Sequence, residues 1–211
     1  MSTLPVQPLI AVDVVPLCWS SAGLLLGTAR RRFEPYEGRF ALPGVLLDTG
    51  ELLDDAAHRA LAGKAGIGPE QVRHLFQIGA FDGPDREPRR HAISIAFVAV
   101  VDPAVLGESS DDVHWEPAGE SASLPFDHDR IVAESLRAVR TGLWHDDDLT
   151  RALTGPWFST PDAVRLTETV GGAQVHQSNL RRSLAADSRL RSTTSPVPAG
   201  PGRRPLVWEW L

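Results

Sequence analysis

Short apolar runs in the first half of the chain, separated by glycine, proline and polar residues, are typical of a β-rich domain. A tight turn at residues 20–23 joins the first two predicted strands. A hydrophilic loop at 82–90 separates the last two long ones. The predicted strands cover residues 10–15, 23–27, 40–44, 75–78 and 92–101, with a short strand or turn at 114–115.

Two helices are predicted among these strands. In the first, over residues 53–65, apolar residues recur every four positions and form one stripe for a core: Leu53, Ala57, Leu61 and Ala65. The second covers residues 127–140, with Asp127 at its N-cap. Strands of this number with helices on both sides predict an α/β/α sandwich.

The C-terminal part follows a different pattern. Residues 141–150 combine a turn with three aspartates and predict a linker, so the chain divides into residues 1–145 and 146–211. The acidic run itself indicates a solvated linker or a capped helix start, not a metal site. Beyond it, the run from Ser159 to Asp162 is a helix start, with a hydroxyl cap and proline in the first turn. That helix should stop at Gly171-Gly172.

A second short helix should begin near Val175, followed by strands at 188–191 and 206–211 around a proline- and glycine-rich hairpin tip. Trp208 and Trp210 in the returning strand are interpreted as core residues. Two helices joined by a glycine turn and followed by a hairpin predict a winged helix-turn-helix.

Composition narrows the class of protein. The chain has 211 residues and a single cysteine, Cys18, which lies in an apolar run and is interpreted as a core residue. No apolar run approaches the roughly 18 residues of a membrane helix, and the N-terminus lacks the pattern of a signal peptide. These features predict a cytoplasmic protein.

Charge is unevenly distributed along the chain. Residues 151–211 carry eight arginines and four acids, a net charge of +4. Because the net charge of the whole chain is −6, residues 1–150 carry −10. A basic tail on an acidic body suggests a polyanionic partner, and the alternative is an ordinary fluctuation of charge in a short segment.

Residues 42–67 carry the most informative motif: a loop with Gly50-Glu51, then seven residues to Arg59, then a helix ending at Gly66-Ile67. This spacing resembles the Nudix box, whose helix glutamates hold Mg²⁺ for diphosphate hydrolysis. Three such glutamates are replaced here by Ala60, Gly63 and Lys64, which are expected to share one helix face, and Val45 replaces a loop glycine. The resemblance predicts a Nudix domain without hydrolytic activity, and no bound metal.

Short segments along nearly the whole chain resemble one Nudix family in particular, the transcriptional regulators of NAD metabolism called NrtR. The segments are residues 12–15, 37–44, 85–89, 124–128, 179–182 and 202–205. The resemblance implies a dimeric repressor of NAD biosynthesis or salvage genes that binds double-stranded DNA. It also implies release from the operator by ADP-ribose or a related nucleotide.

The candidate ligand contacts are three arginines, one aromatic residue and one acid, with Lys64 treated separately below. Arginines are suited to phosphate because a guanidinium can form a bidentate fork, and Arg39, Arg86 and Arg89 are the candidates. Phe81 is a candidate for stacking on adenine, or equally a core residue. Glu51 is included, although pairing with Arg59 to hold the loop is favoured over ligand binding, and His128 is interpreted as a packing residue.

Lys64 is the only lysine in the chain and occupies the position of a metal-binding glutamate. Its ammonium could take over the neutralising charge of a metal without activating water. The alternative, weighted equally, is a solvated helix lysine.

On the second predicted helix of the C-terminal part, Leu180 and Leu184 are expected to face the core. Gln177, Ser178, Arg181 and Arg182 lie away from that stripe and are the candidate contacts to bases and phosphates. Arg203 and Arg204, at the foot of the hairpin tip, are candidates for a wing contact.

Two other functions stay open at this point. One is an ADP-ribose-type pyrophosphatase with a displaced metal site, using carboxylates such as Asp54, Asp55 or Asp82. The other is a binding scaffold that neither hydrolyses nor binds DNA.

Overall fold

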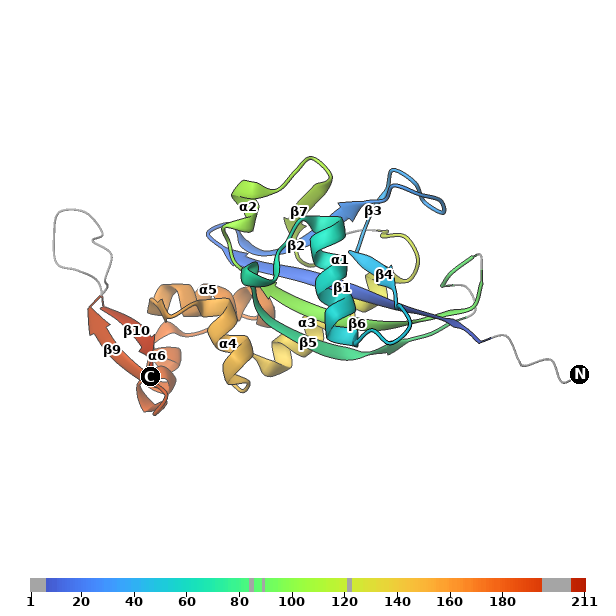
Figure 1. Ribbon diagram of the computed structural model, residues 1–211. Coiled ribbons are helices and arrows are strands. Elements are labelled where there is room, and N and C mark those ends of the chain that lie inside the picture. Colours follow the sequence, from blue (N-terminus) through green and yellow to red (C-terminus); the bar gives the residue numbers. More distant parts are fainter. Residues whose placement is uncertain (1–6, 84–85, 89, 121–122, 195–205) are drawn as a thin grey trace, which may run out of the picture.

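The computed structural model describes residues 7–83, 86–88, 90–120, 123–194 and 206–211 (Figure 1). Its larger part is a seven-stranded sheet with the order β3-β2-β1-β6-β5, in which β4 also pairs with β1 and β7 with β2. The strands are β1 (Leu9–Ser20), β2 (Gly23–Arg30), β3 (Phe40–Ala41), β4 (Gly44–Leu46), β5 (Val72–Phe81), β6 (Ala92–Val101) and β7 (Val113–Pro117).

The central strands β1 and β6 run parallel over nine residue pairs, from Leu9–Ala92 to Leu17–Val100. Residues 12–18 of β1 are all buried. Burial on both faces explains why these strands are continuous apolar runs instead of alternating ones. Most predicted strands are confirmed and are longer than expected, but the one predicted at 40–44 is interrupted at residues 42–43 and divides into β3 and β4.

Helices cover both faces of this sheet, which confirms the predicted α/β/α sandwich. On one face, α1 (Leu53–Ala60) continues into η1 (Leu61–Ala65), a π-helical turn that ends at Gly66 in the left-handed conformation. On the other face lie α3 (His128–Gly142) and α4 (Asp147–Thr154). The short elements η2 (Pro69–Gln71) and α2 (Val105–Glu108) complete this part.

The prediction for Asp127 is half right. It occupies the N-cap position of α3, but its side chain accepts no capping hydrogen bond. Its carboxylate instead lies 3.3 Å from Nε of Arg86. A buried cation outcompetes the helix terminus for this carboxylate.

The predicted linker at 141–150 is wrong. Gly142 ends α3, and α4 starts only five residues later, with Asp146 capping it by accepting a hydrogen bond from the Leu149 amide. Leu149 and Leu153 of α4 are 2% exposed. The alternative interpretation of the three aspartates, a capped helix start, is confirmed, and the two after Asp146 lie in the first turn of α4 and favour its start through the helix dipole.

The smaller sheet has the order β8-β10-β9. Its module consists of β8 (Trp157–Phe158), α5 (Thr160–Gly171), α6 (Gln177–Ala186), β9 (Leu190–Thr194) and β10 (Leu206–Trp210). Ser159 and Asp162 form the expected capping box, and Gly172 ends α5 in the left-handed conformation. This is the predicted winged helix-turn-helix arrangement, with the hairpin tip at 195–205 outside the described residues.

The C-terminal module has a buried cluster of its own around Leu184 and Trp208, and a second cluster spans both modules. Leu153 of α4 and Leu166 and Val170 of α5 belong to the same buried cluster as Val15 and Leu17 of β1. Figure 1 shows α4 and α5 between the large sheet and the β9–β10 hairpin. No helix in the described part of the chain is long and apolar enough to cross a membrane.

Candidate functional site

The loop before α1 is held to the helix by the predicted pair of Glu51 and Arg59. Nε and Nη2 of Arg59 each donate to one carboxylate oxygen of Glu51 at 2.7 Å, and Nη2 also donates to the Leu46 carbonyl at 2.8 Å. The Asp48 amide donates to the same carboxylate at 2.9 Å. Hydrogen bonding from Arg59 lowers the pKa of Glu51 to about 2. Both carboxylate oxygens are therefore engaged in shaping the loop.

The positions of the missing carboxylates do not all share one face. Ala60 is fully buried under the sheet, whereas Gly63 and Lys64 are exposed and line a cavity. The prediction is thus wrong for Ala60. In the π-helical turn that starts at Leu61, backbone hydrogen bonds join residues five positions apart. The side chains after Ala60 therefore point in other directions around the helix axis than they would in an α-helix.

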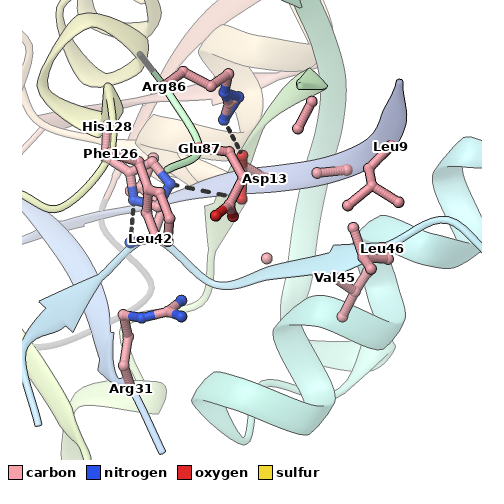
Figure 2. Close-up of a pocket in the computed structure, with 13 residues that line it drawn as sticks. Leu9, Asp13, Arg31, Leu42, Val45, Leu46, Arg86, Glu87, Phe126 and His128 are labelled. Atoms are coloured by element: carbon pink, nitrogen blue, oxygen red, sulfur yellow. Dashed lines mark hydrogen bonds and ion pairs between the residues drawn. The ribbon is translucent and has the colours of Figure 1, made fainter. Parts of the chain in front are cut away.

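A first cavity of about 140 Å³ opens between β1, β4 and the start of α3. Its walls combine apolar side chains with one charged cluster. Asp13 at its base is buried, and its carboxylate accepts hydrogen bonds from Nη2 of Arg86 at 2.9 Å and Oγ of Ser94 at 2.6 Å. Figure 2 shows Arg86 and His128 both directed at Asp13.

Arg86 lies between two carboxylates. It is 7% exposed, pairs with Asp13 and lies next to Asp127, while its Nη1 has no hydrogen-bond partner in the structure. A buried guanidinium with an unused donor is costly, because each unpaired buried polar group loses its hydration. Arg86 therefore has capacity for one further acceptor at this cavity.

His128 is a buried structural histidine, as interpreted from the sequence. Its Nδ1 accepts a hydrogen bond from the Leu42 amide at 3.0 Å. Burial lowers the pKa of His128, and this effect outweighs the opposite effect of nearby Asp13. The ring is therefore neutral at pH 7, and it fixes the strand end at Leu42 on the wall of the cavity.

A second cavity of about 220 Å³ adjoins the first and shares Arg31, Leu42 and Gly44 with it. Its distinguishing feature is positive charge, from the three consecutive arginines at the end of β2 and Lys64 from η1; the lining also includes Phe33 and Asp112. We call the two cavities together the ligand groove. Gly44 is required on its floor, since a Cβ there would lie 2.0 Å from Oδ1 of Asp13.

At the other end of the molecule, α6 presents its polar residues to solvent. Leu184 is buried and Leu180 half-buried, as predicted. Gln177, Ser178, Arg181 and Arg182 are exposed and line one shallow hollow. Glu168 of α5 accepts a hydrogen bond from the Val175 amide at 3.0 Å and so helps hold the turn before α6.

The hairpin is fixed by its tryptophans. Trp208 and Trp210 are 7% and 9% exposed, and their indole N–H groups donate to Oγ1 of Thr160 and Thr154 at 2.9 and 3.0 Å. This confirms their interpretation as core residues. Arg203 and Arg204, the predicted wing contacts, lie outside the described residues.

Comparison with known proteins identifies the larger module. A sequence model of the NUDIX domain matches residues 8–138, more than half of the chain. The chain belongs to the Nudix family. A curated relative, an ADP-ribose pyrophosphatase from Methanocaldococcus jannaschii, is 33% identical over 110 residues. The match covers 51% of this chain and 63% of that protein, so the chain spans less than two thirds of the relative's length.

Solved structures extend the likeness to both modules. Shewanella oneidensis NrtR in complex with a 27mer DNA is 19% identical, with a TM-score of 0.77 over 96% of this chain and 93% of that one. The Nudix domain of the same protein, crystallised with ADP ribose, is 22% identical, with a TM-score of 0.52 over 63% of this chain and 89% of that one. At these identities the likeness shows a shared NrtR-like fold.

Only part of the predicted set of ligand contacts lines the ligand groove. Lys64 and Arg86 line it. Arg39 lies outside both cavities, with its guanidinium bonded to the Ser123 carbonyl. Phe81 is buried and covered by Arg130, 5.3 Å from its ring centre, as the core alternative predicts. Arg89 lies outside the described residues.

Sequence reasoning missed Arg30, Arg31 and Arg32. These arginines follow the strand predicted at residues 23–27, and no local pattern relates them to Lys64. Only the fold places them in one cavity with Lys64, because η1 and β2 come into contact through the packing of distant segments.

Proposed function

We propose that this Nudix protein is a ligand-responsive transcriptional regulator. Residues 1–145 act as the sensor of ADP-ribose or a related nucleotide, and residues 146–211 bind a double-stranded DNA operator. The observation that carries the proposal is the exposed polar set on α6, presented by a helix-turn-helix whose other side is packed into a core.

DNA binding follows from the chemistry of that surface. A helix of this kind fits the major groove, where arginine donates to guanine and phosphate, and glutamine pairs with adenine. Gln177, Ser178, Arg181 and Arg182 supply these groups, and the surrounding segment carries a net +4. Arg203 and Arg204 are proposed as wing contacts. The existence of an NrtR–DNA complex with the same fold supports this assignment.

Nucleotide sensing follows from the groove. Its cations suit a diphosphate, and its apolar walls around Leu42 and Phe126 suit a nucleoside. ADP ribose bound to the NrtR Nudix domain and the activity of the curated relative both favour this ligand class. Lys64 and Arg86 are the first contacts expected, and Arg39, Glu51, Phe81 and Arg89 stay secondary candidates.

Hydrolysis is the second candidate function, favoured by the 33% identity to a pyrophosphatase. Nudix hydrolysis needs a metal, and the residues present do not fit one. Ala60, Gly63 and Lys64 supply no carboxylate, and the described segments contain no group of three or more His, Cys, Asp or Glu side chains that could hold a metal. This argues for binding without turnover.

Two further features of the proposal come from the NrtR-like architecture. A homodimer would place two copies of α6 on a palindromic site, since one winged helix reads only a few base pairs. Genes of NAD metabolism are the proposed targets, with the protein as their repressor.

A gel-shift experiment tests the proposal. Duplexes from upstream of the protein's own gene and of neighbouring NAD genes are titrated with the protein, with and without ADP-ribose. A shifted duplex whose affinity changes with ADP-ribose supports the regulator. Absence of any shift at low salt, together with metal-dependent AMP release, would support the hydrolase instead.

A further inference from the structure

The second cavity of the ligand groove has an unusual balance of charge for a Nudix protein. Four cations line it, Arg30, Arg31, Arg32 and Lys64, against the single acid Asp112. A hydrolytic site of this family would collect carboxylates here to hold a metal against the substrate's phosphates. Here Gly63 and Lys64, two of the positions where the Nudix box has glutamates, line the cavity without a carboxylate.

The arginines are held in place before any ligand arrives. Arg30 lies over the Phe40 ring at 4.6 Å and donates to the Gly38 carbonyl at 3.1 Å. Arg31 lies over the Phe126 ring at 4.8 Å and donates to the Pro35 carbonyl at 2.7 Å. Such fixed guanidiniums lose little conformational entropy when they bind an anion.

Asp112 orients the outer part of the cluster. Its carboxylate accepts from Nη2 of Arg32 at 3.0 Å and lies 3.7 Å from Nε of Arg30. One acid shared by two arginines leaves a net positive cavity. Lys64, from η1, forms no hydrogen bond or ion pair with any residue that the structure describes. Among the described parts of the chain, its ammonium therefore differs from the three guanidiniums in having no protein partner.

We propose that Lys64 and Arg30–Arg32 form a diphosphate site that works without a metal ion. The ammonium and guanidiniums supply the neutralising charge that a metal supplies in a hydrolytic relative, and they activate no water, so the ligand is bound and not consumed. Arg31 lines both cavities and is seen in Figure 2 on the wall of the first. It would place the diphosphate next to that first cavity. This inference rests on the proposed nucleotide-sensing function and names the part of the ligand that the groove recognises.

Calorimetric titration tests the site, with ADP-ribose and inorganic pyrophosphate as separate probes, in EDTA and in Mg²⁺. We expect ADP-ribose to bind equally well in both buffers. Lys64→Gln and Arg32→Gln should each weaken binding roughly tenfold, which corresponds to about 1.4 kcal/mol, because each removes one charged hydrogen bond to the diphosphate. Lys64→Arg should retain most of the affinity, and Arg137→Gln, at an exposed ion pair on α3, should change nothing.

The outcomes separate the site from the proposed function. Loss of ADP-ribose binding in EDTA, or unchanged affinity in Lys64→Gln, overturns the metal-free site while leaving a nucleotide sensor in place. If ADP-ribose does not bind at all but pyrophosphate binds in EDTA and depends on Lys64, the site stands and the proposed effector is wrong. Circular dichroism of each variant confirms that affinity changes do not reflect unfolding.

Discussion

The helix α1–η1 and the helix α6 are the two elements that the sequence singled out, and they differ in how their residues are used. The first buries Ala56, Ala57, Ala60 and Leu61 completely against the sheet. The second buries only Leu184 and leaves its polar side chains in solvent. One helix has kept its packing and lost its carboxylates, and the other packs little and exposes its polar groups.

This difference separates two kinds of constraint. Packing of α1–η1 holds the walls of the groove together, so its apolar positions are needed for the fold whether or not the groove catalyses a reaction. The exposed face of α6 contributes little to stability, so its residues are free to match a partner. Retention of a fold is therefore weak support for retention of an activity, whereas the chemistry of exposed side chains bears on function directly.

The largest expected effect concerns hydrolysis. With Mg²⁺ or Mn²⁺, the protein should release AMP from ADP-ribose several orders of magnitude more slowly than the Methanocaldococcus jannaschii relative, because metal activation lowers the pKa of water from 15.7 to about 7. Chromatography of nucleotides at enzyme concentrations far below substrate measures this. Rapid metal-dependent AMP release would contradict the comparison and would direct attention to Asp54, Asp55 or Asp82 as metal ligands.

The next largest effect concerns the exposed face of α6. Arg181→Ala with Arg182→Ala should weaken DNA binding by about 1–3 kcal/mol per residue. If both contact phosphates, the slope of log affinity against log salt should fall by roughly 1.8. Fluorescence anisotropy at several salt concentrations measures both quantities, with Arg137→Ala as the surface-arginine control. Equal affinity of the double variant and the parent at all salt concentrations would eliminate α6 as the reading helix.

A smaller effect tests the core that joins the two modules. Leu153→Ala should lower the free energy of unfolding by about 2–5 kcal/mol, the range for a buried leucine. Because Leu153 belongs to the same buried cluster as strands of the large sheet, both modules should unfold in one transition at lower denaturant. Two separate transitions in the parent, only one of which moves in the variant, would show that the modules fold independently.

The smallest effect is the contribution of His128, at the wall of the groove, to the pH dependence of the free energy of unfolding. Because burial lowers its pKa in the folded protein, folding favours the neutral ring. The unfolded chain binds a proton near pH 6.5. The contribution of this residue to stability is therefore complete above about pH 6.5 and declines as pH falls towards the folded pKa. Urea unfolding at several pH values should show a steeper acid decline in the parent than in His128→Gln, and parallel profiles would contradict this account.

Local patterns predicted most of the fold. Continuous apolar runs located the strands, four-residue spacing located α1, and capping and glycine signals located α5. The errors arose where tertiary packing determined which local structure forms. The acidic run at 146–148 allowed either a solvated linker or a capped helix start, and it starts α4, whose leucines enter the buried cluster shared with the large sheet. The π-helical turn that separates Ala60 from Gly63 and Lys64 has no signal in the pattern.

The candidate site was predicted less completely. Lys64 was found because a motif gave its position a chemical expectation. Arg86 stays a predicted anion contact that lines the groove, and its burial between Asp13 and Asp127 depends on three distant segments. Arg30–Arg32 were missed because their relation to Lys64 exists only after the sheet and α1–η1 assemble.

Linkage between the groove and α6 is the central claim, and one reciprocal measurement tests it most directly. The affinity for ADP-ribose is measured with the free protein and with the protein saturated by its DNA duplex, in EDTA and at one salt concentration. If the two sites are coupled, DNA must change the ADP-ribose affinity by the same factor by which ADP-ribose changes the DNA affinity. We expect a weaker ADP-ribose affinity on DNA, and the same affinity with and without DNA would contradict the account.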